Sequence, residues 1–281
     1  MREIIQVQEV SYIYNQGRED QVLALEDITL NIREGEFLAV LGHNGSGKST
    51  LARLLNALLI PSRGKVMVDN LSTDDPKNLW KIRQNAGMVF QNPDNQIVAT
   101  TVEEDAAFGP ENLGLPSKEI RARVDDALKR VGIYELAKRP PHLLSGGQKQ
   151  KVAIAGVFSM RPRCLILDEP TALLDPEGRR EVLQTVKDIN REEKITVVYI
   201  THFMEEAVAA DRIVVMEQGR IVMDGPPRKI FSKVDKLRKL GLDVPQVTEL
   251  ALLLKKEKGF HNLPEDILET EELVNFICSS R

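Results

Sequence analysis

A glycine-rich stretch, Gly42-His43-Asn44-Gly45-Ser46-Gly47-Lys48-Ser49-Thr50, holds residue types that bind phosphate. Glycines let backbone N–H groups turn toward an anion, and a helix that begins there adds partial positive charge. Lys48 can reach the β- and γ-phosphates of a nucleotide, and the Ser49 hydroxyl can ligate Mg²⁺. The stretch lies between an apolar run and a leucine-rich segment at helical spacing. A strand, a glycine loop and a helix in this order predict a P-loop that binds ATP through residues 42–50.

An acidic pair, Asp168 and Glu169, follows the apolar residues 164–167. The carboxyl ends of strands are where parallel α/β sheets form their sites. We expect Asp168 to hold Mg²⁺, directly or through water. Glu169 is placed to polarise an attacking water as a general base. Adjacent acidic residues are often only surface charge, but a P-loop earlier in the chain favours the catalytic interpretation.

Three other polar or aromatic residues are candidates because of where they stand relative to strands. Gln91 ends one apolar run and is expected to bind Mg²⁺ or the attacking water, although a lone glutamine there is often a surface amide. His202 ends another run and is expected to hydrogen-bond the γ-phosphate, with a purely structural role as the alternative. Tyr14 precedes a polar loop, where it either packs within its strand or offers an aromatic face to adenine.

A second phosphate-binding feature is Leu144-Ser145-Gly146-Gly147-Gln148, which lies at the start of a predicted helix. One γ-phosphate cannot occupy two separate sites in one chain without rearrangement. A second copy that faces the first head to tail would let each Ser145–Gln148 segment cover the other subunit's nucleotide. The sequence therefore predicts a dimer with two ATP molecules between the subunits; the alternative is a glycine-rich helix start that serves only packing.

The order of the elements predicts how these residues are positioned. Apolar runs at 37–41, 86–90, 164–167 and 195–200 are separated by helical patterns. Such alternation is typical of a largely parallel sheet that is covered on both faces. Residues 1–35 alternate loosely and predict antiparallel strands. We therefore expect an α/β fold of the P-loop NTPase type with an antiparallel β subdomain.

Two regions are predicted to be mainly helical. From about residue 92 to 162 the composition is polar and helical, which predicts a helical subdomain with Gly109-Pro110 as a helix breaker. Short amphipathic helices are predicted at 247–254 and 270–278. These patterns predict two domains, a nucleotide-binding domain at residues 1–230 and a C-terminal helical extension at residues 231–281.

Composition limits the classes of function that are open. The chain of 281 residues carries a net charge of −4, which disfavours a nucleic-acid partner. Its cysteines, Cys164 and Cys278, form no disulfide framework and are expected to be reduced thiols of a cytosolic protein. We find no run of 18 apolar residues and no N-terminal signal pattern, so we expect that the chain neither spans a membrane nor leaves the cytosol by itself.

Taken together, these motifs resemble those of ATP-binding cassette (ABC) ATPases over roughly residues 1–230. The resemblance rests on the P-loop, the Gln91 loop, Leu144–Gln148, Asp168-Glu169, Asp175 and His202 in that order. It implies that Tyr14 stacks on adenine, that Glu169 is the catalytic base and that His202 contacts the γ-phosphate. It also implies that Ser145, Gly146, Gly147 and Gln148 act in trans. Asp175 would lie in a loop that links the two sites, although its position as a helix N-cap already explains it.

A finer resemblance is carried by residues 91–96, 101–112 and 240–245. These segments are similar to the ATPase subunits of energy-coupling factor (ECF) transporters, which import vitamins and transition-metal ions. That family implies a transmembrane coupling protein, an exchangeable substrate-binding membrane protein and a second ATPase subunit in a homo- or heterodimer. It further implies a peripheral location on the cytoplasmic face of the cell membrane. The loop 170–174 is closer to the general ABC form, which leaves open which of two paralogous ATPases this is.

The ECF resemblance also assigns contacts. The segment after Gln91 would dock helices of the coupling protein, and Asp94 would meet an arginine there. The C-terminal extension is expected to form a dimer contact. The alternative is a soluble ABC-type ATPase that acts on nucleic acid or on the ribosome. Chromosome-structure members carry long heptad arms and ribosomal members carry two cassettes, and this sequence has neither feature. An ordinary P-loop kinase would leave Ser145–Gln148 unexplained.

Overall fold

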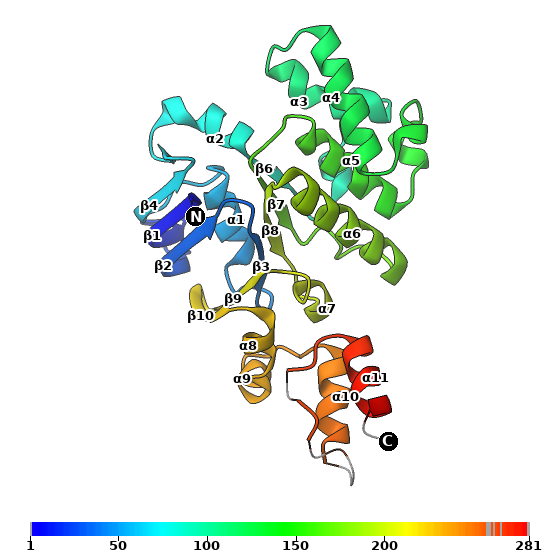
Figure 1. Ribbon diagram of the computed structural model, residues 1–281. Helices are drawn as coiled ribbons and strands as arrows, with labels where there is room; N and C mark the ends of the chain where they lie inside the picture. Colours follow the sequence, from blue (N-terminus) through cyan, green and yellow to red (C-terminus); the bar gives the residue numbers. More distant parts are fainter. Residues whose placement is uncertain (1, 257–259, 261, 265, 280–281) are drawn as a thin grey trace.

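A computed structural model describes residues 2–256, 260, 262–264 and 266–279 (Figure 1). In these residues the strands form a four-stranded sheet of order β2-β1-β4-β5 and a six-stranded sheet of order β10-β9-β3-β8-β7-β6. The smaller sheet consists of β1 (Glu3–Tyr14), β2 (Val22–Arg33), β4 (Arg63–Val68) and β5 (Leu71–Ser72). Its strands are antiparallel, with Val7 opposite Leu30 and Val66, so the expected antiparallel strands of the N-terminal region are confirmed.

The larger sheet is mainly parallel, as the alternation of strands and helices predicts. It consists of β3 (Phe37–Leu41), β6 (Ala86–Val89), β7 (Cys164–Asp168), β8 (Thr196–Ile200), β9 (Arg212–Glu217) and β10 (Arg220–Gly225). β3 lies between β8 and β9, β7 lies between β6 and β8, and these four pairs are all parallel. Only β10 pairs antiparallel within this sheet. Every residue of β3, β7 and β8 is buried, which explains their continuous apolar runs.

The two faces of the larger sheet bury alternate residues in different cores. Leu38 and Val40 of β3 pack into a core with the smaller sheet and α1 (Lys48–Leu55). Phe37, Ala39 and Leu41 face the opposite core, which includes side chains of α5 (Gly146–Phe158) and α6 (Pro176–Glu193). Side chains of a strand alternate between its faces, so one apolar strand supports both layers. The P-loop strand is thereby held from both sides.

A group of helices between β6 and β7 forms the upper part of the molecule in Figure 1. It contains η2 (Pro93–Asn95), α3 (Val102–Asn112), α4 (Ser117–Arg130), η3 (Tyr134–Leu136), η4 (Pro141–Leu143) and α5. The expectation that Gly109-Pro110 breaks the helix is wrong, because α3 continues through both residues. Pro110 cannot donate a hydrogen bond to the Ala106 carbonyl, four residues earlier. The Ser159 hydroxyl of the neighbouring segment donates to that carbonyl instead, at 2.8 Å.

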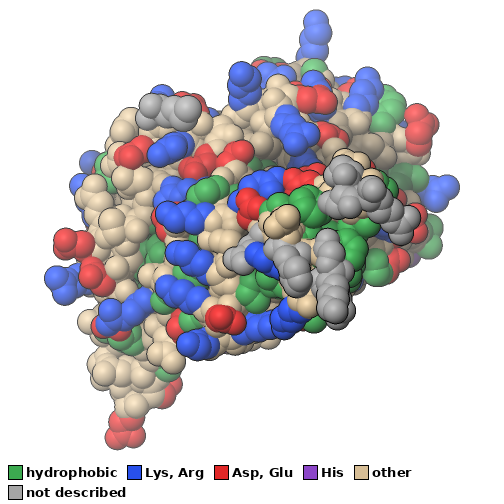
Figure 2. Space-filling view, turned by 60° about the horizontal axis from the view of Figure 1, so that its bottom comes forward, with side chains coloured by type: hydrophobic (Ala, Val, Ile, Leu, Met, Phe, Trp, Pro, Cys, Tyr) green, Lys and Arg blue, Asp and Glu red, His purple; other side chains and the backbone are tan. Residues whose placement is uncertain are grey.

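Shorter elements connect these layers: η1 (Pro76–Asn78), α2 (Leu79–Asn85) and α7 (Met204–Ala207). The chain then continues into α8 (Pro227–Phe231), α9 (Val234–Lys239), α10 (Gln246–Leu254) and α11 (Thr270–Ser279). The two amphipathic helices expected in this region are confirmed, and they pack around a small core that includes Ala251, Leu263 and Leu273. Figure 2 views the side that carries the C-terminal helices, where hydrophobic side chains lie beside Lys and Arg side chains. Among the described residues, no helix is long and apolar enough to cross a bilayer.

Candidate functional site

The P-loop connects β3 to α1 and holds its lysine inside the loop. Lys48 is 4% exposed, and its Nζ donates to the carbonyl oxygens of Gly42 at 2.8 Å and His43 at 3.0 Å. Gly47 has φ +101°, and a Cβ there would lie 2.8 Å from the Ala24 carbonyl oxygen. Only glycine fits this position, because both the left-handed backbone and the close approach exclude a side chain. The loop therefore presents its backbone and the start of α1 to the same side.

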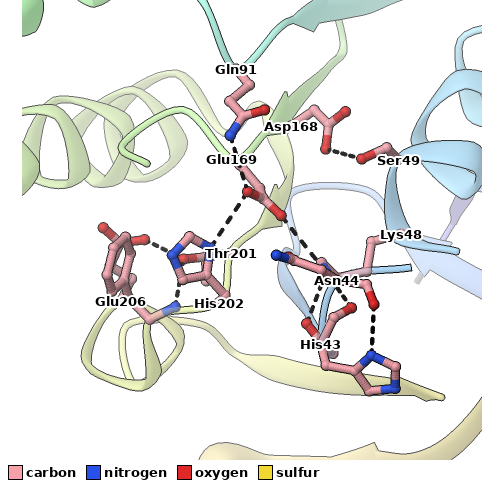
Figure 3. A network of polar contacts seen from close by, with 12 residues as sticks. His43, Asn44, Lys48, Ser49, Gln91, Asp168, Glu169, Thr201, His202 and Glu206 are labelled. Atoms are coloured by element: carbon pink, nitrogen blue, oxygen red, sulfur yellow. Dashed lines mark hydrogen bonds and ion pairs between the residues drawn. The ribbon is translucent and has the colours of Figure 1, made fainter. Parts of the chain in front are cut away.

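Ser49 and Asp168 meet where α1 begins and β7 ends. The Ser49 hydroxyl donates to Asp168 Oδ1 at 2.9 Å (Figure 3). Burial raises the pKa of the Asp168 carboxyl, and the hydrogen bond from Ser49 opposes this shift. Burial also lowers the pKa of Lys48, while the Glu169 and Asp168 carboxylates raise it. The site thus holds charged groups of both signs in partly dehydrated surroundings, where electrostatic interactions with a bound anion or cation are strong.

Glu169 is the point at which three predicted residues converge. Its carboxylate lies 3.7 Å from Lys48 Nζ and 3.4 Å from His202 Nδ1. The Gln91 side-chain amide donates to the same carboxylate at 3.4 Å, and Figure 3 shows these side chains pointing toward one another from different strand ends. The Glu169 backbone has φ +50°, a left-handed conformation that is uncommon outside glycine, asparagine and aspartate. Such strain is typical of functional sites, where the surroundings hold one side chain in place.

Gln91, Glu169 and His202 line a cleft of about 700 Å³. Gly42, His43, Asn44, Gln91, Glu169 and His202 form one part of its lining. The other part comes from the segment Gly241–Val244 together with Gln246 and Glu249, beside the start of α10. This contribution could not be predicted from the sequence, because the segment carries no phosphate-binding pattern. It is close to the site only because the chain folds back after α9.

Tyr14 ends β1 beside the P-loop helix. Its hydroxyl lies 3.2 Å from Thr50 Oγ1, and its ring packs edge to face against Tyr12 at a centroid distance of 4.8 Å. The contact with Thr50 joins the smaller sheet to the first turn of α1. Both alternatives for Tyr14, strand packing and stacking on adenine, are compatible with this position.

The Ser145–Gln148 segment forms the N-terminus of α5. Ser145 and Gln148 make a capping box: Ser145 Oγ accepts from the Gln148 backbone at 3.3 Å, and Gln148 Oε1 accepts from the Ser145 backbone at 3.1 Å. Ser145 and Gly146 are exposed. In the described part of the chain, none of these four residues is among those that line the cleft. The structure of one chain therefore leaves this segment free for another contact.

Asp175 and Asp94 lie at two further loops. Asp175 is the N-cap of α6, where its Oδ1 accepts from the Gly178 backbone at 2.8 Å, as expected for an Asp-Pro helix start. Asp94 lies in η2, and its carboxylate accepts from Lys149 Nζ of α5 at 2.7 Å. The Asp94 side chain nevertheless stays 63% exposed. Neither carboxylate contributes to the lining of the cleft.

One residue beside the site escaped the sequence analysis. Glu206 in α7 is 5% exposed and accepts hydrogen bonds from the hydroxyls of Thr171 and Thr201. These threonines flank the segments that carry Glu169 and His202. Nothing in the sequence distinguished Glu206 from its exposed neighbour Glu205, since only the folded chain separates the buried carboxylate from the solvated one.

Comparison with known proteins places these features in a family. Residues 25–172 match the family model described as ABC transporter. The "Energy-coupling factor transporter ATP-binding protein EcfA1" of Caldanaerobacter subterraneus subsp. tengcongensis is 60% identical over 98% of this chain and 99% of that protein. The protein of the same name from Clostridium novyi is 58% identical over 98% of each.

Solved structures agree with this relationship. A structure of cbiO1 from Clostridium perfringens, described as part of the ABC transporter complex cbiONQ, is 43% identical. It matches with a TM-score of 0.77 over 89% of this chain and 99% of that one. A dimeric structure of the ATP-binding cassette MJ0796 bound to ADP and Pi is 33% identical, with a TM-score of 0.71 over 79% and 98%. The chain is a nucleotide-binding ABC ATPase of the α/β P-loop fold, and within that family it belongs to the energy-coupling factor transporter ATP-binding proteins.

Proposed function

We propose that this chain binds and hydrolyses ATP as a subunit of an ECF-type importer and thereby energises uptake through a membrane coupling protein. The observation that carries the proposal is the cleft lined by Gln91, Glu169 and His202, where the Glu169 carboxylate also contacts the P-loop Lys48. Ser49 and Asp168 form a hydrogen-bonded pair nearby. The relatives that share nearly the full chain length are named as ATP-binding proteins of such transporters. Vitamins and transition-metal ions are the proposed substrate classes.

Each site residue has a chemical task in this proposal. Residues 42–50 bind the phosphates, with Lys48 as the cation, and Tyr14 stacks on the adenine ring. Glu169 accepts a proton from the attacking water, and Gln91 and His202 hold the water and the γ-phosphate in position. Phosphoryl transfer depends mainly on positioning and on charge stabilisation, which a cleft with fixed donors supplies. The contacts of the Glu169 carboxylate with Lys48, His202 and Gln91 support the assignment of this residue as the base.

Mg²⁺ is the proposed metal cofactor. The Ser49 hydroxyl and the Asp168 carboxylate, which are hydrogen-bonded to each other, are hard oxygen donors of the kind that Mg²⁺ prefers, and the Gln91 amide oxygen would be a third. Among the described residues there is no group of three or more His, Cys, Asp or Glu side chains suited to hold a metal ion. This donor set fits Mg²⁺, which usually takes one or two protein carboxylates together with substrate phosphates. When bound, Mg²⁺ would neutralise charge on the phosphates.

The dimer is the second part of the proposal. Ser145–Gln148 would cover the ATP of a second ABC subunit, which is either the same chain or a paralogue. The first N–H groups of a helix have no partners within it, so the start of α5 can donate to phosphate oxygens. Asp175 would lie in the loop between the two sites. The C-terminal extension, residues 231–281, supplies a further contact with the second subunit. Its Leu250, Leu253 and Val274 are exposed, and burial of these apolar side chains against a second subunit would favour association.

An apolar groove supports docking of a membrane partner. It has a volume of about 290 Å³ and lies between α2, the segment after Gln91 and the helices α3 and α5. Trp80 is 60% exposed, Val98 67% and Phe108 55%, and all three line it. Exposed aromatic side chains around a groove are typical of sites that bind an amphipathic helix. We assign the groove to a helix of the transmembrane coupling protein. This contact would hold the chain peripherally on the cytoplasmic face, near a substrate-binding membrane protein.

Asp94 at the edge of this region offers a test. Replacement by arginine should weaken co-purification with the coupling protein, because it reverses the charge offered to a partner arginine. The Lys149→Ala variant is the matched control, since it also removes the ion pair between Lys149 and Asp94 but keeps the exposed carboxylate. Transport restored by an arginine-to-aspartate change in the partner would support the contact. Unchanged assembly of the Asp94→Arg variant would exclude it, and capture of nucleic acid in place of a membrane protein would contradict the transport proposal.

A further inference from the structure

Glu206 is a buried carboxylate whose two oxygens have different partners. The Thr171 hydroxyl donates to Oε1 at 2.7 Å, and the Thr201 hydroxyl donates to Oε2 at 2.5 Å. Glu206 is 5% exposed, and Thr171 and Thr201 are each 1% exposed. One carboxylate therefore bridges two hydroxyls that come from loops after different strands, β7 and β8.

The two threonines adjoin the catalytic candidates. Thr171 lies two residues after Glu169, in a turn where the Ala172 backbone donates to the Glu169 carbonyl at 3.2 Å. Thr201 immediately precedes His202, and its Oγ1 also accepts from the Phe203 backbone at 3.0 Å. The Thr201 hydroxyl therefore connects the residue before His202 to the backbone of the residue after it. Figure 3 shows Thr201 and Glu206 directly behind His202, on the side of it away from Lys48.

The surroundings of Glu206 supply little compensation for its charge. Burial raises the pKa of the Glu206 carboxyl, while its hydrogen bonds with Thr171 and Thr201 and the charges of Arg179 and His202 oppose the shift. The Arg179 guanidinium lies over the Phe203 ring, 4.1 Å from its centroid. The Tyr199 hydroxyl is buried nearby, and burial together with the Glu206 carboxylate raises its pKa. Burying a carboxylate in this way is costly, and an apolar residue would fill the space more cheaply.

We propose that Glu206 is a positioning residue for ATP hydrolysis, which joins the loop of Glu169 to the loop of His202 through the hydroxyls of Thr171 and Thr201. The proposal rests on the roles proposed above for Glu169 and His202. Glu206 touches neither nucleotide nor water in this account. It fixes the distance between the base and the histidine, and small errors in such distances reduce turnover strongly.

The test compares variants in the assembled transporter. Glu206→Ala should lower kcat for ATP by about tenfold to a hundredfold, because loss of both bonds lets the two loops separate. The dissociation constant for ATP, measured by nucleotide titration, should change by less than about twofold, since the P-loop is intact. Glu206→Gln should recover kcat to within about fivefold, because an amide can accept from one threonine and donate to the other.

Two conservative variants test the proposal even if the alanine variant does not fold. Thr171→Val and Thr201→Val keep side-chain shape but remove one hydroxyl each, and each should lower kcat with little change in KM. Thr185→Val is the matched control, because Thr185 of α6 is buried and its hydroxyl donates to the Glu181 carbonyl at 2.9 Å, away from the cleft and from the C-terminal extension. It should lose a similar amount of thermal stability without loss of kcat.

The outcomes distinguish a positioning role of Glu206 from a role in packing alone. If Thr171→Val and Thr201→Val keep the kcat of Thr185→Val, or if Glu206→Gln is as impaired as Glu206→Ala, the proposal is overturned. A Glu169→Gln variant measured in parallel distinguishes failure of the proposed base from failure of the proposed role of Glu206. Full turnover in Glu169→Gln would refute the proposed base, whereas slow Glu169→Gln with normal threonine variants would refute only the role of Glu206.

Discussion

The two phosphate-binding segments of this chain differ in what surrounds them. The P-loop lies in a cleft with Lys48, Glu169, Gln91 and His202, which come from separate elements and contact one another through Glu169. Ser145–Gln148 is an exposed helix start whose capping box satisfies Ser145 and Gln148. It offers backbone N–H groups and a hydroxyl but no charged side chain. In the proposed dimer, the first segment would carry the reacting groups, and the second would contribute neutral donors to a phosphate held by another subunit.

The largest effect on ATP hydrolysis is expected from a change in the cleft beside the P-loop. Glu169→Gln should slow ATP hydrolysis by about 10² to 10⁴-fold, because the amide cannot accept a proton from water. ATP binding should persist, and the closed dimer should accumulate and be visible by size-exclusion chromatography with ATP. The exposed Glu135 in η3 provides the control Glu135→Gln. Turnover at the parental rate in Glu169→Gln would rule out this residue as the base.

A comparable loss is expected from the second segment, for a different reason. In Gly147→Asp a negative charge would face the γ-phosphate of the partner's ATP, and hydrolysis should fall by about 10² to 10³-fold. The helix itself should tolerate the change, since a Cβ at Gly147 lies 3.6 Å from its nearest neighbour and acidic residues suit a first turn. Gly147→Ala makes the same backbone change without the charge. Equal rates for the two variants would argue against a phosphate at this segment.

The affinity for ATP should respond differently to changes in the P-loop and in the Ser145–Gln148 segment. Lys48→Ala should weaken ATP binding by about tenfold to a hundredfold, because a charge-assisted contact contributes roughly 1.5–3 kcal/mol. Gly147→Asp should leave the affinity of the monomer unchanged. The exposed Lys65 on β4 gives the control Lys65→Ala. Titration with a fluorescent nucleotide measures all three, and unaltered affinity in Lys48→Ala would contradict the role of the P-loop.

The smallest effect concerns the edge of the P-loop site. Tyr14→Ala should weaken ATP binding by about fivefold to tenfold if the ring stacks on adenine, since a stacking contact at the lower end of the usual range is worth about 1–1.4 kcal/mol. Tyr14→Phe loses only the contact between the hydroxyl and Thr50, and it should bind like the parent. The same titration with GTP and ATP shows whether the ring reads a base. No change in Tyr14→Ala would favour the alternative, in which Tyr14 only packs within its strand.

Much of the fold follows from local pattern. The P-loop strand, the strand before Asp168 and the strand before His202 are short apolar runs, and burial on both faces of a parallel sheet requires that composition. Asp175-Pro176 predicts its helix start because N-cap and first-turn preferences are local. The convergence of Gln91, Glu169 and His202 follows because the carboxyl ends of parallel strands share one edge.

Other features depend on tertiary contacts that a sequence does not display. Helix α3 contains Pro110, and the Ser159 hydroxyl lies within hydrogen-bond distance of the Ala106 carbonyl that proline leaves unbonded. Glu206 is buried and Glu205 is exposed, although the residues are identical and adjacent. The segment 241–244 lines the same cleft as Gln91, Glu169 and His202 because of a chain reversal after α9. Helix α4 takes Pro116 as its N-cap and Ser117 as its first residue, although serine is a favoured N-cap residue.

The central claim is that a complete ATP site contains the P-loop of one subunit and the Ser145–Gln148 segment of another. The most direct measurement is to mix purified Lys48→Ala and Gly147→Asp chains, each inactive alone, under conditions in which subunits exchange. A head-to-tail dimer of the two variants contains one site with an intact P-loop and an intact partner segment, so about a quarter of all sites should be restored. Recovery of ATP hydrolysis on mixing is the predicted result. A mixture that stays as inactive as its components, although exchange is demonstrated, would contradict the account.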